Sequence, residues 1–592
     1  MFTTTSAVGR LLRFVFLLGC WAGLTSLCQA QSSTSPLARP VQLQNPNGTL
    51  GSVLAEITQQ TQLTFGYSND LVEATTRVKA PAGAQTVERI LDAILPSNGL
   101  TYTVLDQQII IRKKAASKSR KVTFSGYVRD AASGENLIGV SVVLPGSGQG
   151  TATNTYGFYS LTVPAADSVR LLVSYLGYEQ VRWTTTAISN VRQDFGLRAL
   201  RNELAGVEVV GSREEQLARS TRMGTINVPI AQIKTLPRLF GETDVLKVMQ
   251  LLPGVQSGSE GQSGLYVRGG SPDQNLILLD GTPVYNASHL FGFFSVFNAD
   301  ALNNVELIKG GFPARYGGRL SSVLDISMKE GNMQEFHGEG AVGIVASKIT
   351  LEGPIKKDTA SFIISARRTY LDILAQPFIK SQLAQDGSKG SIGYFFHDLN
   401  AKLNWKLTSR DRLYLSAYTG YDKFYARIRD KESGGDYSNT KAGLGWGNLT
   451  SALRWNRIVN NQLFMNTHFT YSKYQFNVGQ EEERRYTDQG TPRTSKYSLR
   501  YFSNIRDFSL KTDFDYVPSP DHYIRFGGQY ILHSFRPGAL QQKDNFTDQN
   551  NEFNSGVRTL ASEGSLYVED DYRLTDRLKV NGGLRLNGFL VK

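Results

Sequence analysis

The sequence predicts a multidomain protein: a small α+β domain, a β-sandwich, a second α+β unit with many glycine turns, and strands of a transmembrane β-barrel. The first observation is length, because 592 residues exceed one ordinary domain. The second is that no interior stretch reaches the roughly 18 apolar residues that a membrane-spanning helix needs. The third is the alternation of apolar and polar residues after Phe336, which suits a wall with one face toward lipid and one toward water.

Residues 1–30 have the pattern of a secretory signal peptide. Arg10 and Arg13 precede a short apolar run, and Cys28-Gln29-Ala30 provides a cleavage site. Both cysteines of the chain fall within this segment, so we expect a mature chain without disulfides or thiolate metal ligands. The net charge of +12 comes from basic residues scattered among acidic ones, a pattern that argues against nucleic-acid binding.

Residues 41–113 are predicted to form a small α+β domain. Apolar residues with helical spacing begin at Leu50 and at Val87, and Thr86 is placed to cap the second helix. Strand-like runs surround both helices, and the last two runs form a hairpin about Asp106-Gln107.

Residues 122–199 are predicted to form a β-sandwich, because alternating strands recur between turns. The segment 204–211 follows, which is short, β-branched and bounded by glycines. A segment of this kind can add itself as a strand to an exposed sheet edge. The alternative is that it forms a terminal strand of either neighbouring domain.

Residues 220–330 are predicted to form a compact α+β unit. The run from Val245 to Leu252 has the spacing of an amphipathic helix, and Pro253-Gly254 ends it. Strand-length runs follow, separated by turns in which glycine supplies positive φ. The candidate site residues in these turns are Arg268, Gly269, Gly270, Asp273, Asp280, Gly281, Gly310, Gly311, Arg315, Gly317 and Gly318.

Residues 336–592 are predicted to form about eleven antiparallel strands. Leu403, Trp405 and Leu407, for example, alternate with polar neighbours. Short connections alternate with long polar loops, as they do in outer-membrane barrels. The long loops are placed near 426–444, 479–497 and 536–561.

Five motifs of the unit at 220–330 resemble the plug domain of TonB-dependent outer-membrane receptors. They are LPGV at 252–255, VRGG at 267–270, DQNLILLDG at 273–281, FGFFSVFN at 291–298 and IKGGFPARYGGRLSSVLDI at 308–326. The resemblance implies a globular plug that blocks a β-barrel until TonB of the TonB-ExbB-ExbD system pulls on it from the periplasm. The family's barrel has 22 strands, so we expect the chain to hold the N-terminal part of it, about half. A real barrel of about 10–12 strands is the disfavoured alternative, because the plug would not fit inside it.

Three further stretches resemble parts of such receptors. Residues 41–113 resemble the short N-terminal signalling domain of secretins and TonB-dependent transducers, which contacts an anti-sigma regulator in the periplasm; a passive spacer is the alternative. Residues 122–199 resemble a carboxypeptidase regulatory-like domain, which carries no catalytic residues. The segment 204–211 matches the family's TonB box, and the residues that would contact TonB are Val207, Glu208, Val209 and Val210.

We expect an outer-membrane transporter with periplasmic N-terminal domains and not an enzyme, because the sequence contains no nucleophile motif and no cluster of metal ligands. The resemblance favours active import of a scarce small molecule, with a ferric siderophore as the default, coupled to transcriptional signalling. The alternatives are a surface receptor that mainly signals and a glycan importer. No cofactor is expected. Beyond TonB, the expected partners are the regulator, outer-membrane lipid and the substrate.

The plug arginines Arg268 and Arg315 are predicted either to bridge plug and barrel wall through carboxylates or to have a structural role. Asp273 and Asp280 are predicted to cap turns. In this family the substrate is held by the apices of the plug and by extracellular loops. The resemblance therefore places the substrate against 256–264, 284–298 and the long barrel loops.

Overall fold

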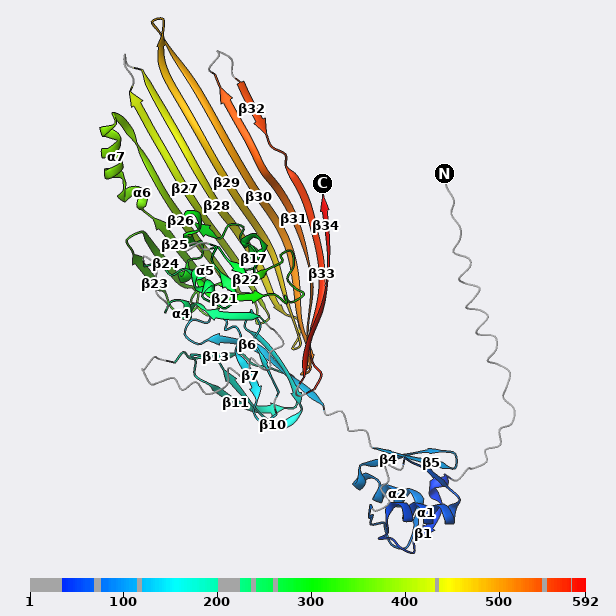
Figure 1. Cartoon of the computed structure of the whole chain (residues 1–592). Helices are drawn as coiled ribbons and strands as arrows, with labels where there is room; N and C mark the ends of the chain where they lie inside the picture. The colour runs from blue at the N-terminus through cyan, green and yellow to red at the C-terminus, as the bar shows by residue number, and fades with distance from the viewer. Residues whose placement is uncertain are drawn as a thin grey trace, which may run out of the picture. The chain divides into compact units, whose positions relative to one another are not determined.

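The computed structural model describes residues 35–68, 76–113, 120–147, 149–200, 224–235, 241–258, 264–431, 436–545, 551–575 and 578–592. The predicted signal peptide and the predicted TonB box lie outside these ranges. The chain divides into two compact units, Met1–Ser119 and Arg120–Lys592 (Figure 1).

The first unit contains two helices and a three-stranded sheet, as the helical spacing and the hairpin signal predict. Helix α1 (Leu50–Thr61) is capped by Thr49, and helix α2 (Val87–Ile94) is capped by Thr86. Both helices bury an apolar face in one shared core. The sheet runs in the order β2 (Thr64–Gly66), β5 (Gln108–Lys113) and β4 (Leu100–Leu105), and β1 (Pro40–Gln42) pairs with β3 (Ala84–Thr86).

The second unit begins with a β-sandwich. One sheet runs in the order β11 (Val181–Ala187), β10 (Ala166–Ser174), β7 (Ser141–Leu144) and β8 (Gln149–Ala152). The other runs β12 (Val191–Arg192), β6 (Lys121–Asp130) and β13 (Phe195–Leu197), with β9 (Phe158–Pro164) also paired to β6. Phe124, Leu161 and Leu171 belong to the apolar cluster that joins the two sheets. The sandwich therefore has a core of its own.

A five-stranded sheet is the centre of the next domain, residues 224–330, which we call the plug. The sheet runs in the order β14 (Thr225–Pro229), β21 (Leu302–Lys309), β22 (Ser322–Met328), β17 (Asn275–Leu279) and β18 (Thr282–Pro283). Helix α5 (Val245–Gln250) begins at Asp244, whose carboxylate accepts hydrogen bonds from two amides of the first turn. The shorter elements are α4 (Ile230–Ile233), β15 (Val255–Gln256), β16 (Tyr266–Val267), β19 (Ser288–His289) and β20 (Phe294–Ser295).

The remaining strands form one antiparallel sheet of 12 strands, which we call the wall (Figure 1). In the described residues its edge strands do not pair with each other, so the sheet is open and is not a closed barrel of that size. The total of 22 strands stays a prediction. The strands are β23 (His337–Val342), β24 (Ala346–Lys356), β25 (Ala360–Thr369), β26 (Ser388–Lys406), β27 (Asp411–Lys431), β28 (Tyr437–Ile458), β29 (Leu463–Asp488), β30 (Thr491–Ser519), β31 (His522–Asp544), β32 (Asn551–Ser555), β33 (Thr559–Arg573) and β34 (Lys579–Val591).

The wall has one apolar face and one polar face, as the predicted alternation requires. An exposed row crosses neighbouring strands in register and consists of Leu403, Leu415, Leu453, Phe469, Leu510 and Tyr530. The adjacent row on the same strands faces inward and consists of Asn404, Tyr414, Arg454, His468 and Lys511. Successive residues of a strand point to opposite faces, so the alternation decides which side chains can meet the plug.

The predicted long loops near 426–444 and 479–497 are wrong, because the strands continue through most of both stretches. Strands β29 and β30 have 26 and 29 residues, and they are joined at Gln489-Gly490, where both residues have positive φ. The third predicted loop, 536–561, is replaced in part by the end of β31 and by β32. An antiparallel ladder pairs backbone groups whatever the polarity of its side chains, so a polar sequence by itself does not end a strand.

Two helices that the sequence analysis did not predict, α6 (Leu371–Leu374) and α7 (Gln376–Gln385), connect β25 to β26. Helix α7 buries none of its residues, so it adds little to any core. No helix in the described ranges is both long and apolar enough to cross a membrane.

Candidate functional site

The plug lies against the polar face of the wall but keeps an apolar core of its own. Among the described residues, Tyr418 is the only wall residue that belongs to that core. Hydrogen bonds and ion pairs join other plug residues to inward-facing side chains of the wall. Buried charges at such an interface cost free energy unless they are paired, so their partners decide how firmly the plug is held.

His289 in β19 forms the most highly charged contact. Its Nδ1 lies 2.5 Å from Asp422 Oδ2, and its Nε2 lies 2.8 Å from Asp398 Oδ1. Arg367 completes the group, because its Nη2 lies 2.6 Å from Asp398 Oδ2 and donates to the Ser295 carbonyl of the plug at 2.9 Å. The Asp398 carboxylate of the wall is therefore shared between a plug histidine and a wall arginine, and the Asp422 carboxylate contacts the same histidine.

The two carboxylates keep the His289 ring charged. Burial alone would lower the pKa of His289, but Asp398 and Asp422 outweigh burial and raise the pKa to about 9. The side chain is 1% exposed, and its ring stacks on Phe396 with 4.1 Å between centroids. A protonated imidazole can donate from both ring nitrogens, which is what two facing carboxylates require.

Asp280, at the end of β17, forms a second buried ion pair. The Nζ of Lys402 in β26 lies 2.9 Å from Asp280 Oδ2 and donates to the Met328 carbonyl at 3.0 Å. The Met328 amide donates in turn to Asp280 Oδ1 at 3.1 Å. The prediction that Asp280 caps a turn is incomplete, because the same carboxylate also neutralises a lysine of the wall.

The loop that carries the RYGG motif is held by β33 and β34 through its backbone. The Ala314 amide donates to Glu569 Oε2 at 2.7 Å, and Arg585 Nη1 donates to the carbonyls of Ala314 and Arg315 at 3.3 and 3.2 Å. A Cβ on Gly317 would lie 2.5 Å from Arg585 Nε. Glycine at this position therefore permits the close approach of the wall arginine.

The predicted plug arginines both make contacts within the plug. Arg268 has a φ of 50°, and its amide donates to the Gly254 carbonyl at 2.9 Å. A Cβ on Gly310 would lie 2.9 Å from Arg268 Nη1, so that glycine makes room for the guanidinium. The Arg315 guanidinium lies 5.6 Å from the centroid of the Tyr316 ring. These contacts favour a structural role for Arg268. Burial lowers the pKa of Arg315, but the wall carboxylates Asp515 and Asp513 help to raise it, so its bridge to the wall stays a prediction.

The other predicted motif residues shape the turns of the plug. Asp273 accepts a hydrogen bond from Ser271 Oγ at 2.5 Å, and its role as a turn cap stays a prediction. Gly270 has ordinary φ but lies in a crowded place, since a Cβ there would come within 2.4 Å of Ser321 Oγ. The predicted glycines with positive φ are Gly269, Gly281, Gly310, Gly311 and Gly318.

Sequence reasoning missed most of the residues that form the ionic contacts, namely His289, Arg367, Asp398, Lys402 and Asp422. A signal existed for two of them, because every second residue of β26 from Asp398 onward is polar and faces inward. No local pattern marked His289, since its two partners are 109 and 133 residues away in the sequence.

Most of the predicted substrate-binding stretch at 284–298 is packed against the wall. The Asn286 carbonyl accepts a hydrogen bond from Asn448 Nδ2 at 2.7 Å, and the Ser288 carbonyl accepts one from Trp446 Nε1 at 3.3 Å. These contacts show that much of the stretch anchors the plug. Of the other predicted stretch, 256–264, the residues 259–263 lie outside the described ranges.

Phe291 is the one exposed residue of 284–298, with 65% of its surface accessible. Its ring lies 4.8 Å from that of Trp446, and the ring of Tyr394 lies 6.5 Å from Trp446. Leu290 and Phe291 have φ values of 47° and 54°, a conformation that is strained for bulky side chains and is concentrated at functional sites. The result is an aromatic cluster where plug and wall meet, in which Phe291 is exposed and Trp446 is buried.

The described residues contain no group of three or more His, Cys, Asp or Glu side chains that could hold a metal ion. The carboxylates that hold the plug are instead matched by cations or by donors: Asp398 by His289 and Arg367, Asp280 by Lys402, and Glu569 by the Ala314 amide. These paired groups at the interface therefore hold the plug against the wall.

Two family models match the chain. The TonB-dependent Receptor Plug Domain matches residues 222–322, and the CarboxypepD_reg-like domain matches residues 124–210. The first match covers most of the plug, and the second covers most of the β-sandwich and the segment after it.

Several known proteins are similar to parts of the chain. The vitamin B12 transporter BtuB of Vibrio vulnificus is 29% identical over 136 residues, which are 22% of this chain and 22% of that protein. The ferrienterobactin receptor of Escherichia coli is 26% identical over 252 residues, which are 36% of this chain and 34% of that protein. The chain can also be aligned with the crystal structure of the outer membrane transporter YddB from Escherichia coli. The alignment covers 62% of this chain and 56% of the YddB chain, with 13% identity and a TM-score of 0.41. The chain thus spans well under two thirds of the curated relatives that it matches.

A plug seated against the polar face of a large antiparallel wall defines the class of outer-membrane receptors with a plug domain. The match to the plug model identifies residues 222–322 as the plug domain of TonB-dependent receptors, and the similar proteins support the same identification. The chain is an outer-membrane protein, and it is a receptor and not an enzyme.

We expect the plug to be held less firmly as the pH rises. A raised pKa gives stability that is fully present below about pH 6.5 and is lost as the pH rises through about 9. The shift of His289 from 6.5 to about 9 corresponds to about 3 kcal/mol. His289→Gln should therefore lower the free energy of plug unfolding at pH 6 by about 3 kcal/mol more than it does at pH 9.5.

The measurement is urea unfolding of the purified receptor at several pH values, followed by protease access to the plug. The matched control is His337→Gln, which replaces an exposed histidine of β23. If the His289→Gln effect were the same at every pH, the charged state assigned to His289 would be wrong.

A second prediction concerns the ion pair between Asp280 and Lys402. Lys402→Met leaves the buried Asp280 carboxylate without its cation, and removal of one partner of a buried pair costs about 3–5 kcal/mol. Asp280→Asn in the same chain removes the uncompensated charge, so the double variant should regain part of the loss. Hydrogen exchange of β22 amides in the intact receptor measures both effects. Strictly additive effects would show that the two side chains do not interact.

Proposed function

We propose that the protein imports a small molecule across the outer membrane, with the energy supplied by TonB of the TonB-ExbB-ExbD system. The observation that carries the proposal is that the plug has a separate apolar core and is held to the wall by polar and ionic contacts. Such contacts can be exchanged for contacts with water when the plug moves, so the plug can shift while the wall stays folded.

A ferric siderophore is the favoured substrate class. Two relatives support it by name, the ferrienterobactin receptor of Escherichia coli and the probable TonB-dependent siderophore receptor PirA of Acinetobacter baumannii. The exposed Phe291 ring, which packs on the buried Trp446, suits a flat or aromatic ligand. A glycan is the alternative substrate. Transcription of the gene under iron limitation, compared with its transcription during glycan feeding, distinguishes the two classes.

The contact with TonB is proposed for Val207, Glu208, Val209 and Val210. The segment is β-branched and flanked by glycines, and an extended segment of this kind binds by adding a strand to the partner's sheet. In the sequence it lies between the last sandwich strand, β13, and the first plug strand, β14. A pull applied there would therefore act on the chain that leads directly into the plug.

The test of import is a proline substitution in this segment. Val209→Pro removes a backbone N–H and cannot pair within a sheet, so uptake of radioactive iron presented with the organism's own siderophores should fall to the level of a strain without TonB. Val209→Ile keeps the amide and the β-branched side chain, and it should import normally. Binding of the iron complex at the cell surface should be unchanged in both. Normal uptake by the Val209→Pro receptor would refute the proposed contact.

A second function, transcriptional signalling, is proposed for residues 41–113. The observation that favours it is that the first unit is compact and has its own apolar core, as a domain that docks on a separate regulator needs. A receptor without residues 41–113 should still import iron but should no longer induce its own gene under iron limitation. Reporter transcription and iron uptake, measured in the same cells, give the two readouts. Unchanged induction would support the passive spacer instead.

A further inference from the structure

The β-sandwich is attached to the wall through a buried aromatic contact. Phe158 stacks on Phe464 of β29 with 5.1 Å between ring centroids, and Tyr156 stacks on the same ring at 5.5 Å. Tyr127 and Ile458 belong to the same buried cluster, which is separate from the core of the sandwich. Large aromatic side chains that are not part of the core of their own domain and pack instead against a neighbouring domain form a docking surface.

Hydrogen bonds surround this aromatic contact. Asn154 Nδ2 donates to Asp515 Oδ2 at 2.8 Å, and Ser160 Oγ donates to the Asn461 carbonyl at 2.8 Å. Asn461 lies in the short turn between β28 and β29, so the sandwich is at the end of the wall with short turns. In barrels of this class that end faces the periplasm.

The sandwich also contacts the plug. Glu135 accepts hydrogen bonds from the Glu330 amide and from Asn303 Nδ2, both at 2.9 Å. The Ser133 carbonyl accepts one at 2.7 Å from the amide of Met333, which follows the plug in the sequence. One domain therefore bridges the plug and the periplasmic rim of the wall. In the described residues no strand of the sandwich pairs with a strand of either neighbour, so separation breaks no backbone ladder.

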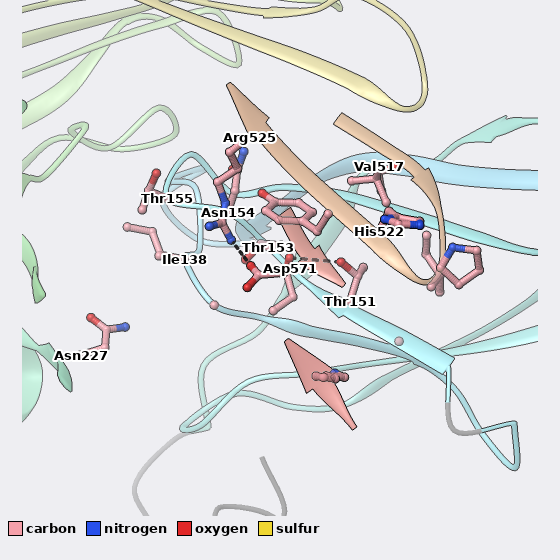
Figure 2. Close-up of a pocket in the computed structure, with 18 of the residues that line it drawn as sticks. Ile138, Thr151, Thr153, Asn154, Thr155, Asn227, Val517, His522, Arg525 and Asp571 are labelled. Atoms are coloured by element: carbon pink, nitrogen blue, oxygen red, sulfur yellow. Dashed lines mark hydrogen bonds and ion pairs between the residues drawn. The ribbon is translucent and has the colours of Figure 1, made fainter. Parts of the chain in front are cut away.

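A cavity of about 450 Å³ lies between these three parts. Its sandwich side is formed by the loop and strand at 150–155, its plug side includes Glu306 and Asp325, and its wall side includes Arg525 and Asp571. Figure 2 shows Thr151, Thr153, Asn154 and Thr155 of the sandwich gathered beside Arg525 and Asp571.

A second cavity, of about 140 Å³, lies between the plug and β29 to β34. Three residues line both cavities: Thr155 of the sandwich, and Arg315 and Asp325 of the plug. Arg315 and Asp325 therefore mark the place where the two spaces adjoin. The space between the plug and this part of the wall is bounded at the periplasmic end by the sandwich.

We propose that the β-sandwich is a second stopper: it closes the periplasmic end of the space between plug and wall, and it must leave the wall before a solute can pass. The aromatic contact holds it in place, and the loop at 150–155 covers the space. This function goes beyond import driven by TonB, because it assigns part of the seal to a domain outside the plug. It does not depend on which substrate is carried.

The test uses ion current through the intact receptor in planar lipid bilayers, with potassium chloride as the only solute. Phe158→Asp places a buried carboxylate against Phe464, so it should release the sandwich while the sandwich core stays intact. The steady current should rise severalfold over that of the unchanged receptor. Leu176→Asp, which also replaces an apolar side chain by a carboxylate but at a position of the sandwich that is 72% exposed, is the control and should carry no extra current.

A cross-link shows whether the current arises from release of the sandwich. The two cysteines of the sequence, Cys20 and Cys28, lie in the predicted signal peptide, so residues 31–592 contain no other thiol that could compete with cysteines at positions 154 and 515 (Asn154→Cys, Asp515→Cys). A short, cleavable bis-thiosulfonate should join them in the docked receptor. In the Phe158→Asp background, joining them should abolish the extra current, and cleavage should restore it.

Two results would overturn the proposal. If the Phe158→Asp receptor cross-links more slowly than the unchanged receptor but stays as tightly closed as the control, then the plug alone forms the seal. If it cross-links as fast as the unchanged receptor, then the aromatic contact does not hold the sandwich. Neither readout requires TonB or a transported ligand, so a failure here is distinct from a failure of the import proposal.

Discussion

Pairing of charges that are buried between plug and wall is the constraint on which the rest of the structure depends. Asp398, Lys402 and Arg367 are 2 to 3% exposed, and none of them could be ionised there without a partner. Arg367 and Asp398 pair with each other within the wall, whereas Lys402 finds its carboxylate, and Asp398 its second cation, only when the plug is seated. The inward polar row of the wall is stable in the presence of the plug, and the plug is held by that row.

The way in which the interfaces are built also decides which parts of the molecule can move as whole domains. Apolar side chains fill the plug and the sandwich, each as its own core, whereas polar groups and one aromatic cluster join these domains to the wall. A domain with its own core can be displaced without unfolding. The proposed TonB contact at 207–210 lies in the sequence between the two domains that would have to move, so one pull could act on both stoppers.

Local signals were enough to predict the elements but not their partners. The alternation around Leu403 and Trp405 predicted a wall with two different faces, and Thr86 was recognised as a helix cap, because both depend on residues a few positions apart. The contact of His289 with Asp398 and Asp422 depends on how β19 lies against β26 and β27, which no spacing in the sequence encodes. Strand length was also missed, since the polar stretch at 479–497 gave no sign that the ladder continues through it. The glycine motifs predicted turns correctly but did not indicate which residues hold the plug against the wall.

The central claim is that the plug is seated against the inner face of the wall, and a cross-link in native outer membranes tests it most directly. The Asn448 side chain donates to the Asn286 carbonyl at 2.7 Å, so cysteines at these two positions should be joined rapidly by a short bifunctional reagent. Leu449, the next residue of β28, faces outward and is 41% exposed; a cysteine there should not be joined to position 286. A cross-link that forms from 448 and not from 449 is the predicted result. Equal cross-linking from both positions, or from neither, would contradict the account.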